Sequence, residues 1–371
     1  MKIMLLCLSL SGGGTERVIT NLANQLSKKN DITIVKLLKR ANDYELDKSI
    51  ATYDIDKADL SNKNPFVCKL KKLSLSRILT LKRLIVKEKP VVIISFLPLP
   101  SFYLMILKRT NRVVKKIPVI LNERGDPNVT FKNKILYFIM KNLYKKADGF
   151  VFQTTDAQNY YKNIVNCHTT IIGNPLNENF IKSDYSHERK KIIVSVGRLE
   201  NQKNHILLMK SFKIIHEKYS DYKLVIYGDG TLRQILEKYI HDNCLDNCVV
   251  LKGKCNCIQD EIYDAKIFVL SSDFEGMPNS LLEALALGIP CISTDCPIGG
   301  ARMLIENGKN GTLVKVNDVN EMSRALEDLI INNDKSIIYS RNAIESVKKF
   351  YPQRVKDEWE KYINYILNKV K

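Results

Sequence analysis

The sequence predicts an α/β protein made of two doubly wound parallel sheets, each in a domain of its own. The chain has 371 residues, which is long for one α/β core, and 45% of them are hydrophobic, enough for two cores. Short apolar segments alternate with helix-forming segments along the chain, as in parallel strands joined by crossover helices. The alternation breaks at residues 172–175 (IGNP) and through the polar stretch 177–191, and then starts again.

The first domain is predicted over residues 1–175. Its opening apolar segment, 3–10, superficially looks like a signal peptide, but three glycines and an amphipathic helix (16–28) follow it in place of a cleavage site. We therefore expect a buried strand there. Further strands are predicted at 32–38, 91–96, 118–122 and 149–153.

The second domain is predicted over residues 176–351, and a helix over 352–371 closes the chain. Its predicted strands are 192–196, 224–227, 249–251, 267–270 and 291–294. The apolar run 91–107 in the first domain is too short to cross a bilayer and is broken by Pro98 and Pro100. We therefore expect no membrane-spanning helix.

Charge and cysteine content narrow the choice of partners and compartment. The formal net charge of +18 favours anionic partners, which include nucleic acid, anionic lipid and nucleotide-sugar phosphate. No nucleic-acid-binding module or set of interleaved aromatic residues is present, so nucleic acid is not expected. The nine scattered cysteines indicate a reducing cytoplasm. Cys244, Cys248, Cys255 and Cys257 lack the paired spacing of structural zinc sites.

The most informative segment is 266–316, which reads as strand, loop, helix, strand and glycine-rich loop. Glu275 is predicted in the loop after the strand, and Glu283 in the first turn of the helix. Ligands of open parallel sheets bind at this edge, where helix N-termini attract phosphate and carboxylates accept hydrogen bonds from sugar hydroxyls. Two plainer interpretations stay open. Ser280 and Glu283 fit a capping box, and Glu275 could be a solvated loop acid.

The whole segment resembles the signature of the retaining family 4 glycosyltransferases, with its glutamate pair, the sequence GIPCIST (288–294) and the late NGTLV (310–314). The resemblance implies the GT-B fold, in which two Rossmann-like domains face each other across a cleft and the terminal helix 352–371 packs back on the first domain. It implies that Glu275 holds the hydroxyls of the donor sugar and that Glu283 holds the ribose. The loop between them is expected to line the donor site through Gly276, Met277, Pro278, Asn279 and Ser280.

A basic loop is expected to bind the donor's diphosphate. Gly197, Arg198 and Lys203 follow the first strand of the second domain, where preorganised cations stabilise a departing diphosphate. The "GRL" sequence and the lysine five residues after the arginine also match the family pattern, although a solvated basic loop is the alternative. Gly228, in the sequence GDGT (228–231), is expected to let the backbone approach a nucleotide closely.

The acceptor is expected on the first domain. Gly13 and Gly14 follow its first strand and are taken as cleft lining, with a purely structural turn as the competitor. The sequence 122–127 (NERGDP) resembles an S-E-R-x-D-P element of bacterial enzymes that transfer N-acetylhexosamine to lipid-linked oligosaccharides. We expect Glu123 and Arg124 to contact the acceptor, although a Glu–Arg pair that anchors a loop explains them nearly as well. No histidine occupies the loop where many relatives carry one, so no general base is identified.

Two basic segments, 69–89 and 131–146, are amphipathic and are expected to rest on an anionic membrane surface, unless their apolar faces pack on the sheet. Asp54 and Asp56 have the spacing of a DxD metal motif but lie in an undistinguished polar stretch, so we expect no metal and no other cofactor. The predicted protein is a cytoplasmic, peripheral membrane hexosyltransferase. It would move an N-acetylhexosamine such as GalNAc from its UDP form to an undecaprenyl-linked glycan of capsule, O-antigen or related biosynthesis. The rivals are a GT-B nucleotide-sugar epimerase and a non-catalytic basic membrane- or nucleic-acid-binding protein.

Overall fold

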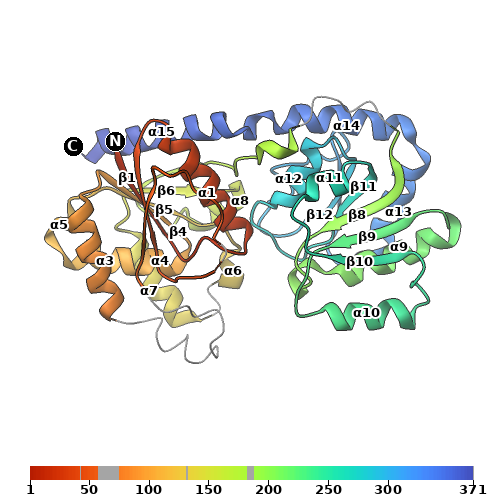
Figure 1. Ribbon diagram of the computed structural model, residues 1–371, viewed down its shortest axis with the longest axis horizontal. Helices are drawn as coiled ribbons and strands as arrows, with labels where there is room; N and C mark the ends of the chain where they lie inside the picture. The colour runs from red at the N-terminus through yellow and green to blue at the C-terminus, as the bar shows by residue number, and fades with distance from the viewer. Residues whose placement is uncertain (42, 57–74, 131–132, 182–187, 371) are drawn as a thin grey trace. The chain divides into compact units, whose positions relative to one another are not determined.

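The computed structural model describes residues 1–41, 43–56, 75–130, 133–181 and 188–370. The chain divides into two compact units (Figure 1). The first unit comprises Met1–Pro175 together with Pro352–Lys371, and the second comprises Leu176–Tyr351.

The first unit is built on a parallel sheet with the strand order β3-β2-β1-β4-β5-β6-β7 among the described residues. Its strands are β1 Lys2–Cys7, β2 Asp31–Lys36, β3 Ala51–Asp54, β4 Val92–Phe96, β5 Val119–Asn122, β6 Gly149–Phe152 and β7 His168–Ile171. In the centre of the sheet, Leu5 is in register with Ile34 on one side and Ile94 on the other, and all three side chains are fully buried. Continuous apolar strands of this kind are typical of a sheet that is covered on both faces.

Helices cover this sheet, and the last helix of the chain is one of them. They are α1 Gly14–Ser27, α3 Leu75–Glu88, α4 Pro98–Thr110, α5 Arg112–Lys115, α6 Pro127–Thr130, α7 Lys134–Tyr144, α8 Thr155–Tyr161 and α15 Pro352–Val370. α15 packs beside α1 (Figure 1) and buries Trp359 and Ile363 in the core of this unit. The Tyr362 hydroxyl donates to the His168 carbonyl (2.6 Å) and accepts from the Phe150 N–H (2.9 Å), which ties α15 to strands β6 and β7.

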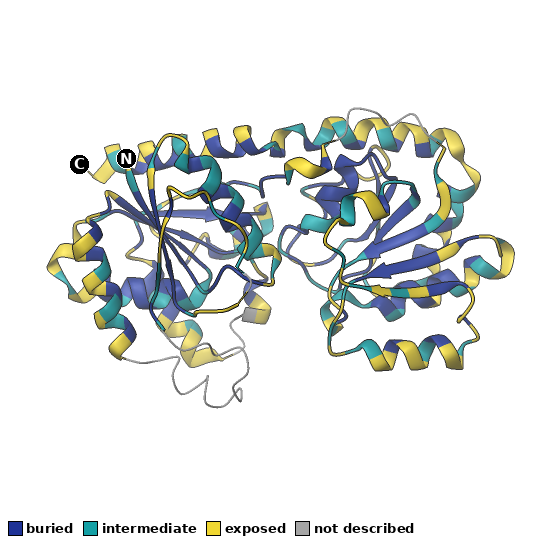
Figure 2. Ribbon diagram, in the orientation of Figure 1, coloured by how far each residue is buried: buried dark blue, intermediate teal, exposed yellow. Residues whose placement is uncertain are grey.

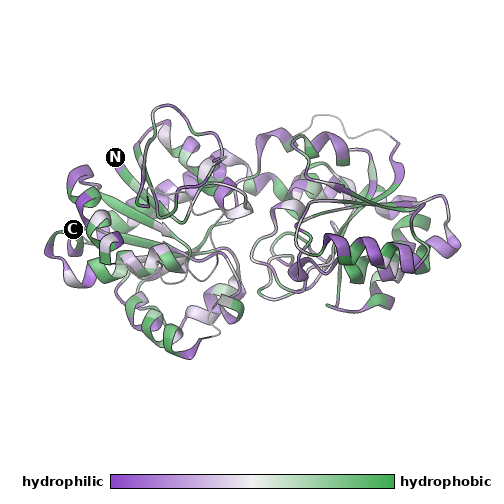
Figure 3. Cartoon of the chain, turned by 60° about the horizontal axis from the view of Figure 1, so that its bottom comes forward, coloured by the Kyte–Doolittle hydropathy of each residue, from purple (hydrophilic) through white to green (hydrophobic). Residues whose placement is uncertain are grey.

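The second unit has a parallel sheet with the strand order β10-β9-β8-β11-β12-β13. Its strands are β8 Lys190–Val196, β9 Lys223–Tyr227, β10 Val249–Gly253, β11 Ala265–Leu270, β12 Cys291–Thr294 and β13 Thr312–Val314. Its helices are α9 His205–Lys218, α10 Arg233–Asp242, α11 Ile258–Ile262, α12 Asn279–Ala286, α13 Val319–Ile331 and α14 Asn333–Val347. In both units the central strands are mostly dark blue in Figure 2 and largely green in Figure 3, because they are buried and hydrophobic.

The prediction of two parallel-sheet α/β units is confirmed, but it did not include three of the strands in the structure. These are β3, β7 and β13, and each is the last strand at one edge of its sheet. Their residues are mostly exposed or half-buried, so they carry no continuous apolar run. An edge strand pairs on one side only, and its side chains need not be apolar for it to form.

The strand order reverses once in each sheet, and this reversal places the functional loops. In the second unit, β8 lies between β9 and β11, so the loop after β8 and the loop after β11 leave neighbouring strands in diverging directions. A crevice at the carboxyl ends of two such strands is where ligands bind in open α/β sheets. The first unit has the same reversal between β1 and β4.

Candidate active site

The loop that follows β8 carries Arg198 and is held by backbone contacts. The Gly197 N–H donates to the Tyr227 carbonyl (2.9 Å), and the Leu199 N–H donates to the Asp229 carbonyl (3.1 Å), so the pairing of β8 with β9 continues beyond both strands. The Arg198 side chain is exposed, with Nη2 3.5 Å from the Gln202 amide oxygen. Its guanidinium therefore projects from an anchored backbone at the reversal in strand order.

Gly228 fits against this loop so closely that a side chain is excluded. A Cβ at this position would lie 1.9 Å from the Gly197 carbonyl oxygen, and the φ angle is +137°. Only glycine adopts such a conformation readily. The sequence predicted that Gly228 allows close approach of a nucleotide; the structure shows that the packing of two loops already requires glycine there.

Lys203 and Glu275 come from neighbouring loops and form an ion pair. Lys203 Nζ lies 2.5 Å from Glu275 Oε1, and the Ser272 hydroxyl donates to the same oxygen (2.8 Å). Glu275 is 8% exposed and Ser272 is fully buried. The interpretation of Glu275 as a solvated loop acid is therefore wrong. Its carboxylate is fixed by a cation and a hydroxyl, and Ser272 is a partner that the sequence analysis did not identify.

Further hydrogen bonds join the loop after β8 to the loop after β11. The Asp273 N–H donates to the Gln202 carbonyl (2.9 Å), and the Ser271 hydroxyl donates to the Lys203 carbonyl (2.8 Å). The Gln202 side-chain amide donates to the Phe274 carbonyl (2.9 Å). The two loops thus form one structure that sets the position of the Lys203–Glu275 pair.

Glu283 is buried in α12 and does not cap that helix. α12 begins at Asn279, its N-cap is Pro278, and no side chain caps it by a hydrogen bond. The capping-box interpretation of Ser280 and Glu283 is therefore wrong. Glu283 is the fifth residue of α12, so the prediction that it lies in the first turn is also wrong; it lies in the second turn and is 5% exposed.

The loop between the two glutamates is tightly enclosed. The Glu275 N–H donates to the Pro297 carbonyl (2.9 Å), and a Cβ at Gly300 would lie 1.5 Å from the Gly276 carbonyl oxygen. Met277 and Pro278 are buried, and the Met277 side chain belongs to the hydrophobic core of the unit. Their side chains therefore support the loop from within. Gly276 in the loop and Asn279 and Ser280 at the start of α12 are partly exposed.

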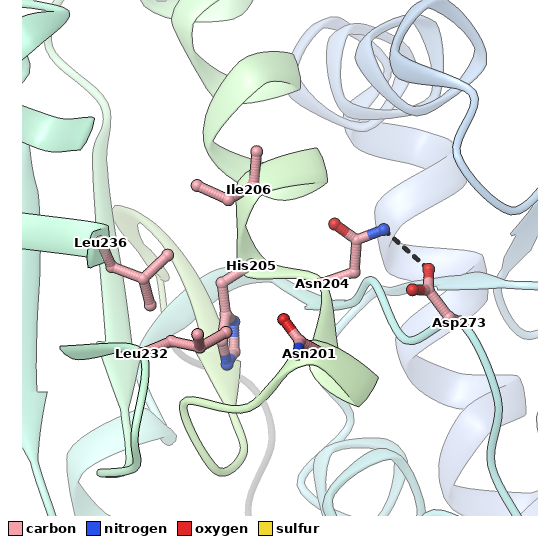
Figure 4. A pocket seen from close by; sticks show the side chains of 7 residues that line it. All are labelled: Asn201, Asn204, His205, Ile206, Leu232, Leu236 and Asp273. Carbon is pink, nitrogen blue, oxygen red and sulfur yellow. Dashed lines mark hydrogen bonds between the residues drawn. The ribbon is translucent and has the colours of Figure 1, made fainter. Parts of the chain in front are cut away.

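His205 is a buried residue of this region that the sequence analysis missed. It is 3% exposed, and its Nε2 lies 3.2 Å from the Arg198 carbonyl oxygen. A carbonyl only accepts, so Nε2 carries a proton. Burial lowers the pKa of His205 to about 4, so the ring is neutral at neutral pH. The ring borders a cavity of about 180 Å³ (Figure 4), which is lined by Asn201, Asn204, His205, Ile206, Leu232, Leu236 and Asp273. The sequence signal was a histidine two residues after Lys203.

The glycine-rich loop of the first unit leads from β1 into α1. Gly13 is the N-cap of α1, which begins at Gly14, and the Glu16 carboxylate folds back over Gly13. A Cβ at Gly13 would lie within 2.2 Å of Glu16 Oε2. Gly13 therefore has a structural role at the start of α1, and the predicted lining role of both glycines stays a prediction.

Glu123 and Arg124 follow β5 but do not pair with each other. The Tyr144 hydroxyl donates to Glu123 Oε1, and burial raises the pKa of Glu123 to about 8. Arg124 donates to Asn122 Oδ1 (3.1 Å) and to Asn174 Oδ1, and burial lowers its pKa to about 9. The alternative of a structural Glu–Arg pair is therefore wrong, because the two side chains have separate partners.

The aspartates with DxD spacing have structural partners. Asp54 pairs with Lys36 (3.0 Å), and Asp56 pairs with Arg77, which is 2% exposed. Among the described residues, no group of three or more His, Cys, Asp or Glu side chains is arranged to hold a metal ion. Nor does the part of the chain that the structure describes contain a helix long and apolar enough to span a bilayer.

Two glycosyltransferase family models match the chain. The model for glycosyl transferases group 1 matches residues 177–346, and the model for glycosyltransferase family 4 matches residues 12–180.

Individual relatives and solved structures agree with these family matches. A GalNAc-alpha-(1->4)-GalNAc-alpha-(1->3)-diNAcBac-PP-undecaprenol alpha-1,4-N-acetyl-D-galactosaminyltransferase of Campylobacter jejuni is 27% identical and covers 99% of each chain. An uncharacterized glycosyltransferase of Methanocaldococcus jannaschii is 30% identical over 69% of this chain and 74% of its own. The sucrose-phosphate synthase of Thermosynechococcus elongatus superposes with a TM-score of 0.83 at 15% identity, covering 99% of this chain and 100% of its own.

These relatives are glycosyltransferases, and they give no support to an epimerase or to a non-catalytic binding protein. The two parallel-sheet units and the structural neighbours confirm the predicted GT-B fold. The chain therefore belongs to the family 4 glycosyltransferases and is a hexosyltransferase.

Proposed function

We propose that this hexosyltransferase transfers an N-acetylhexosamine, with GalNAc as the first candidate, from its UDP form to a glycan on undecaprenyl diphosphate. The relative from Campylobacter jejuni is named as an N-acetyl-D-galactosaminyltransferase that acts on a PP-undecaprenol acceptor, and it aligns along 99% of this chain. The observation that carries the proposal is the Lys203–Glu275 pair, which holds a cation and a carboxylate 2.5 Å apart at the strand-order reversal of the second unit. A nucleotide-sugar needs both, one for its phosphates and one for its hydroxyls.

The donor would be held by four side chains of the second unit. Arg198 and Lys203 would contact the diphosphate, Glu275 the sugar hydroxyls and Glu283 the ribose. Lys203 is paired with Glu275 in this structure, so the Lys203 ammonium would contact both a bound diphosphate and the Glu275 carboxylate. Glu275 would still keep the Ser272 hydroxyl as a partner, which leaves it oriented toward the sugar.

We propose a front-face reaction that retains the anomeric configuration. The bond from the anomeric carbon to the β-phosphate oxygen breaks, and the bond to the acceptor oxygen forms on the same face. The acceptor's proton passes to the departing phosphate, so UDP leaves carrying that proton and no protein base is needed. Charge builds up on the leaving phosphate, and the Arg198 guanidinium and the Lys203 ammonium would stabilise it without a metal ion. We accordingly propose that transfer continues in a chelator.

Membrane contact is proposed on the first unit, mainly through α7. This helix exposes four large apolar side chains, with exposed fractions of 73% for Ile135, 67% for Phe138 and 41% each for Leu136 and Ile139. Lys134, Lys145 and Lys146 are exposed beside them. An apolar strip flanked by cations fits the surface of an anionic bilayer. Residues 131–132 of the predicted segment lie outside the described residues.

The other basic segment, 69–89, is a weaker candidate. Its residues 69–74 lie outside the described residues, and the remainder forms α3. α3 packs against α4 and buries Leu81, Ile85 and the ion-paired Arg77. The apolar face of α3 is therefore partly buried within the unit and less available to a membrane. We propose that α7 seats a peripheral enzyme on the inner face of the cell membrane and that α3 adds positive charge.

UDP release tests the proposed function. The purified enzyme is mixed with a panel of UDP-sugars and with undecaprenyl diphosphate glycans, in buffer with and without EDTA. We expect acceptor-dependent UDP release with a UDP-N-acetylhexosamine, little effect of EDTA, and a loss of at least a hundredfold in Glu275→Ala. Absence of release with every donor and acceptor would refute the proposal.

Liposome flotation tests the membrane contact. Ile135→Ser combined with Phe138→Ser should reduce binding to vesicles that contain anionic lipid. The matched control is Ile235→Ser on α10, which removes an apolar side chain that is 58% exposed in the second unit. Equal flotation of the wild type and the α7 variant would exclude α7 as the contact.

A further inference from the structure

Arg124 carries a positive charge with no carboxylate partner. It donates to Asn122 Oδ1 (3.1 Å) and to Asn174 Oδ1, and both are neutral amide oxygens. In the swapped amide orientation of Gln153, its oxygen lies 2.9 Å from Arg124 Nη2 and is an alternative neutral acceptor to Asn174 Oδ1. Among the described residues no ion pair to Arg124 is formed. A guanidinium that is partly buried without a counter-charge is costly, because desolvation of the charge is not offset.

The nearby carboxyl groups do not neutralise this charge. Glu123, the adjacent residue, turns to Tyr144 and has a pKa raised to about 8 by burial, so it is largely protonated at neutral pH. Glu16 raises the pKa of Arg124 by its charge, but burial outweighs this effect and lowers the pKa. The hydrogen-bond acceptors of Arg124 are therefore neutral, and Asp126 of the same loop accepts from the Asn128 N–H (2.8 Å).

The amides hold the guanidinium at a ligand-binding edge. Asn122 ends β5, Gln153 follows β6 and Asn174 follows β7, and these three strands are neighbours in the sheet. The carboxyl ends of parallel strands are where ligands bind in this kind of fold. A guanidinium has five N–H donors, and two acceptors at a time leave about three for a further partner.

We propose that Arg124 binds a phosphate oxygen of the acceptor's diphosphate. The geometry fits an oxyanion because a planar guanidinium held by neutral acceptors presents its remaining donors as a fork. This inference rests on the proposed function, since it assumes a diphosphate-linked acceptor, and it adds the group that the first unit recognises.

The test combines a change in the enzyme with a change in the acceptor. Wild type, Arg124→Gln and Arg124→Lys are assayed with one glycan carried either on undecaprenyl diphosphate or on a neutral alkyl chain, both in the same detergent. We expect the wild type to lose about tenfold to a hundredfold in kcat/KM with the neutral acceptor, the range for hydrogen bonds to charged groups. Arg124→Gln should be about as slow with both acceptors, and Arg124→Lys should keep part of the preference.

Two controls separate the proposal from its alternatives. Arg109→Gln removes an exposed charge from α4 and should keep the wild-type preference. The affinity for UDP should be unchanged in Arg124→Gln; weaker UDP binding would assign the contact to the donor and overturn the proposal. An equal loss by Arg124→Gln with both acceptors would overturn it as well.

Inorganic diphosphate gives a test that needs no variant. At saturating donor it should inhibit the wild type competitively with the lipid acceptor, and absence of competition would overturn the proposal even if Arg124→Gln did not fold. The acceptor assay also distinguishes failure of the proposed function from failure of the proposed role of Arg124. A wild type that transfers to neither acceptor refutes the proposed function, whereas one that uses both acceptors equally refutes only the role of Arg124.

Discussion

The contact between Gly228 and Gly197 gives a sharp test of how the donor loop is built. In Gly228→Ala, the new Cβ would lie 1.9 Å from the Gly197 carbonyl oxygen, whereas ordinary contact begins at 3.4 Å. The two loops must therefore move apart by about 1.5 Å, and this displaces the backbone that carries Arg198. A misplacement of about 1 Å in a catalytic site can reduce the rate about a hundredfold. We expect a loss of that order in kcat/KM, together with UDP binding weakened at least about tenfold, as for loss of a charged hydrogen bond.

Gly308→Ala is the matched control. Gly308 also has a positive φ, +80°, but nothing lies within 4 Å of a Cβ built there. The substitution therefore carries only backbone strain, about 1–2 kcal/mol. In a unit of this size that strain lowers Tm by about 2–8 °C.

The two variants are compared by thermal unfolding and by calorimetric titration with UDP, each at the same protein concentration. Gly308→Ala should bind UDP as the wild type does, because its strain lies in another loop. Gly228→Ala should unfold at a lower temperature than Gly308→Ala and bind UDP more weakly. If Gly228→Ala binds UDP as tightly as Gly308→Ala, the reasoning from loop packing is wrong.

Three further predictions concern single side chains. The folded pKa of Glu123, about 8, lies above its ordinary value of 4.5, so the native state binds the extra proton and its free energy of unfolding falls as pH rises between these values. Glu123→Gln removes this pH-dependent contribution to stability. The Tm of the variant relative to that of the wild type should therefore increase from pH 5 to pH 8; a Tm difference that stays constant over this range would contradict the raised pKa. His205→Met removes the donor to the Arg198 carbonyl and should weaken UDP binding about fivefold to tenfold. His205→Gln can place an N–H near the same point and should recover most of the affinity for UDP. Equal UDP binding by the two variants would exclude a role for the hydrogen bond to the Arg198 carbonyl. Ser272→Ala should raise KM for the donor about fivefold by removing one of the two partners of Glu275, while Ser220→Ala at an exposed position just after α9 should not.

Much of the fold could be predicted because its central strands are continuous apolar runs. Segments such as 192–196 and 291–294 have few alternatives to burial, and the structure places them inside the sheet. The edge strands and the start of α12 could not be predicted in this way. Pro278 is the N-cap, so Asn279 is the first residue of the helix and Glu283 falls two positions further along than the capping pattern suggested.

The sequence by itself determined the family, the two parallel sheets and the residue types that follow strands β8 and β11. Those properties depend on local order along the chain, namely apolar period, motif spacing and turn residues. Only the tertiary structure decided which side chains meet. It paired Lys203 with Glu275 across 72 positions, turned Glu123 to Tyr144, and left Arg124 among neutral amides. Such partners follow from strand order and loop packing, which bring distant segments together and which no local pattern encodes.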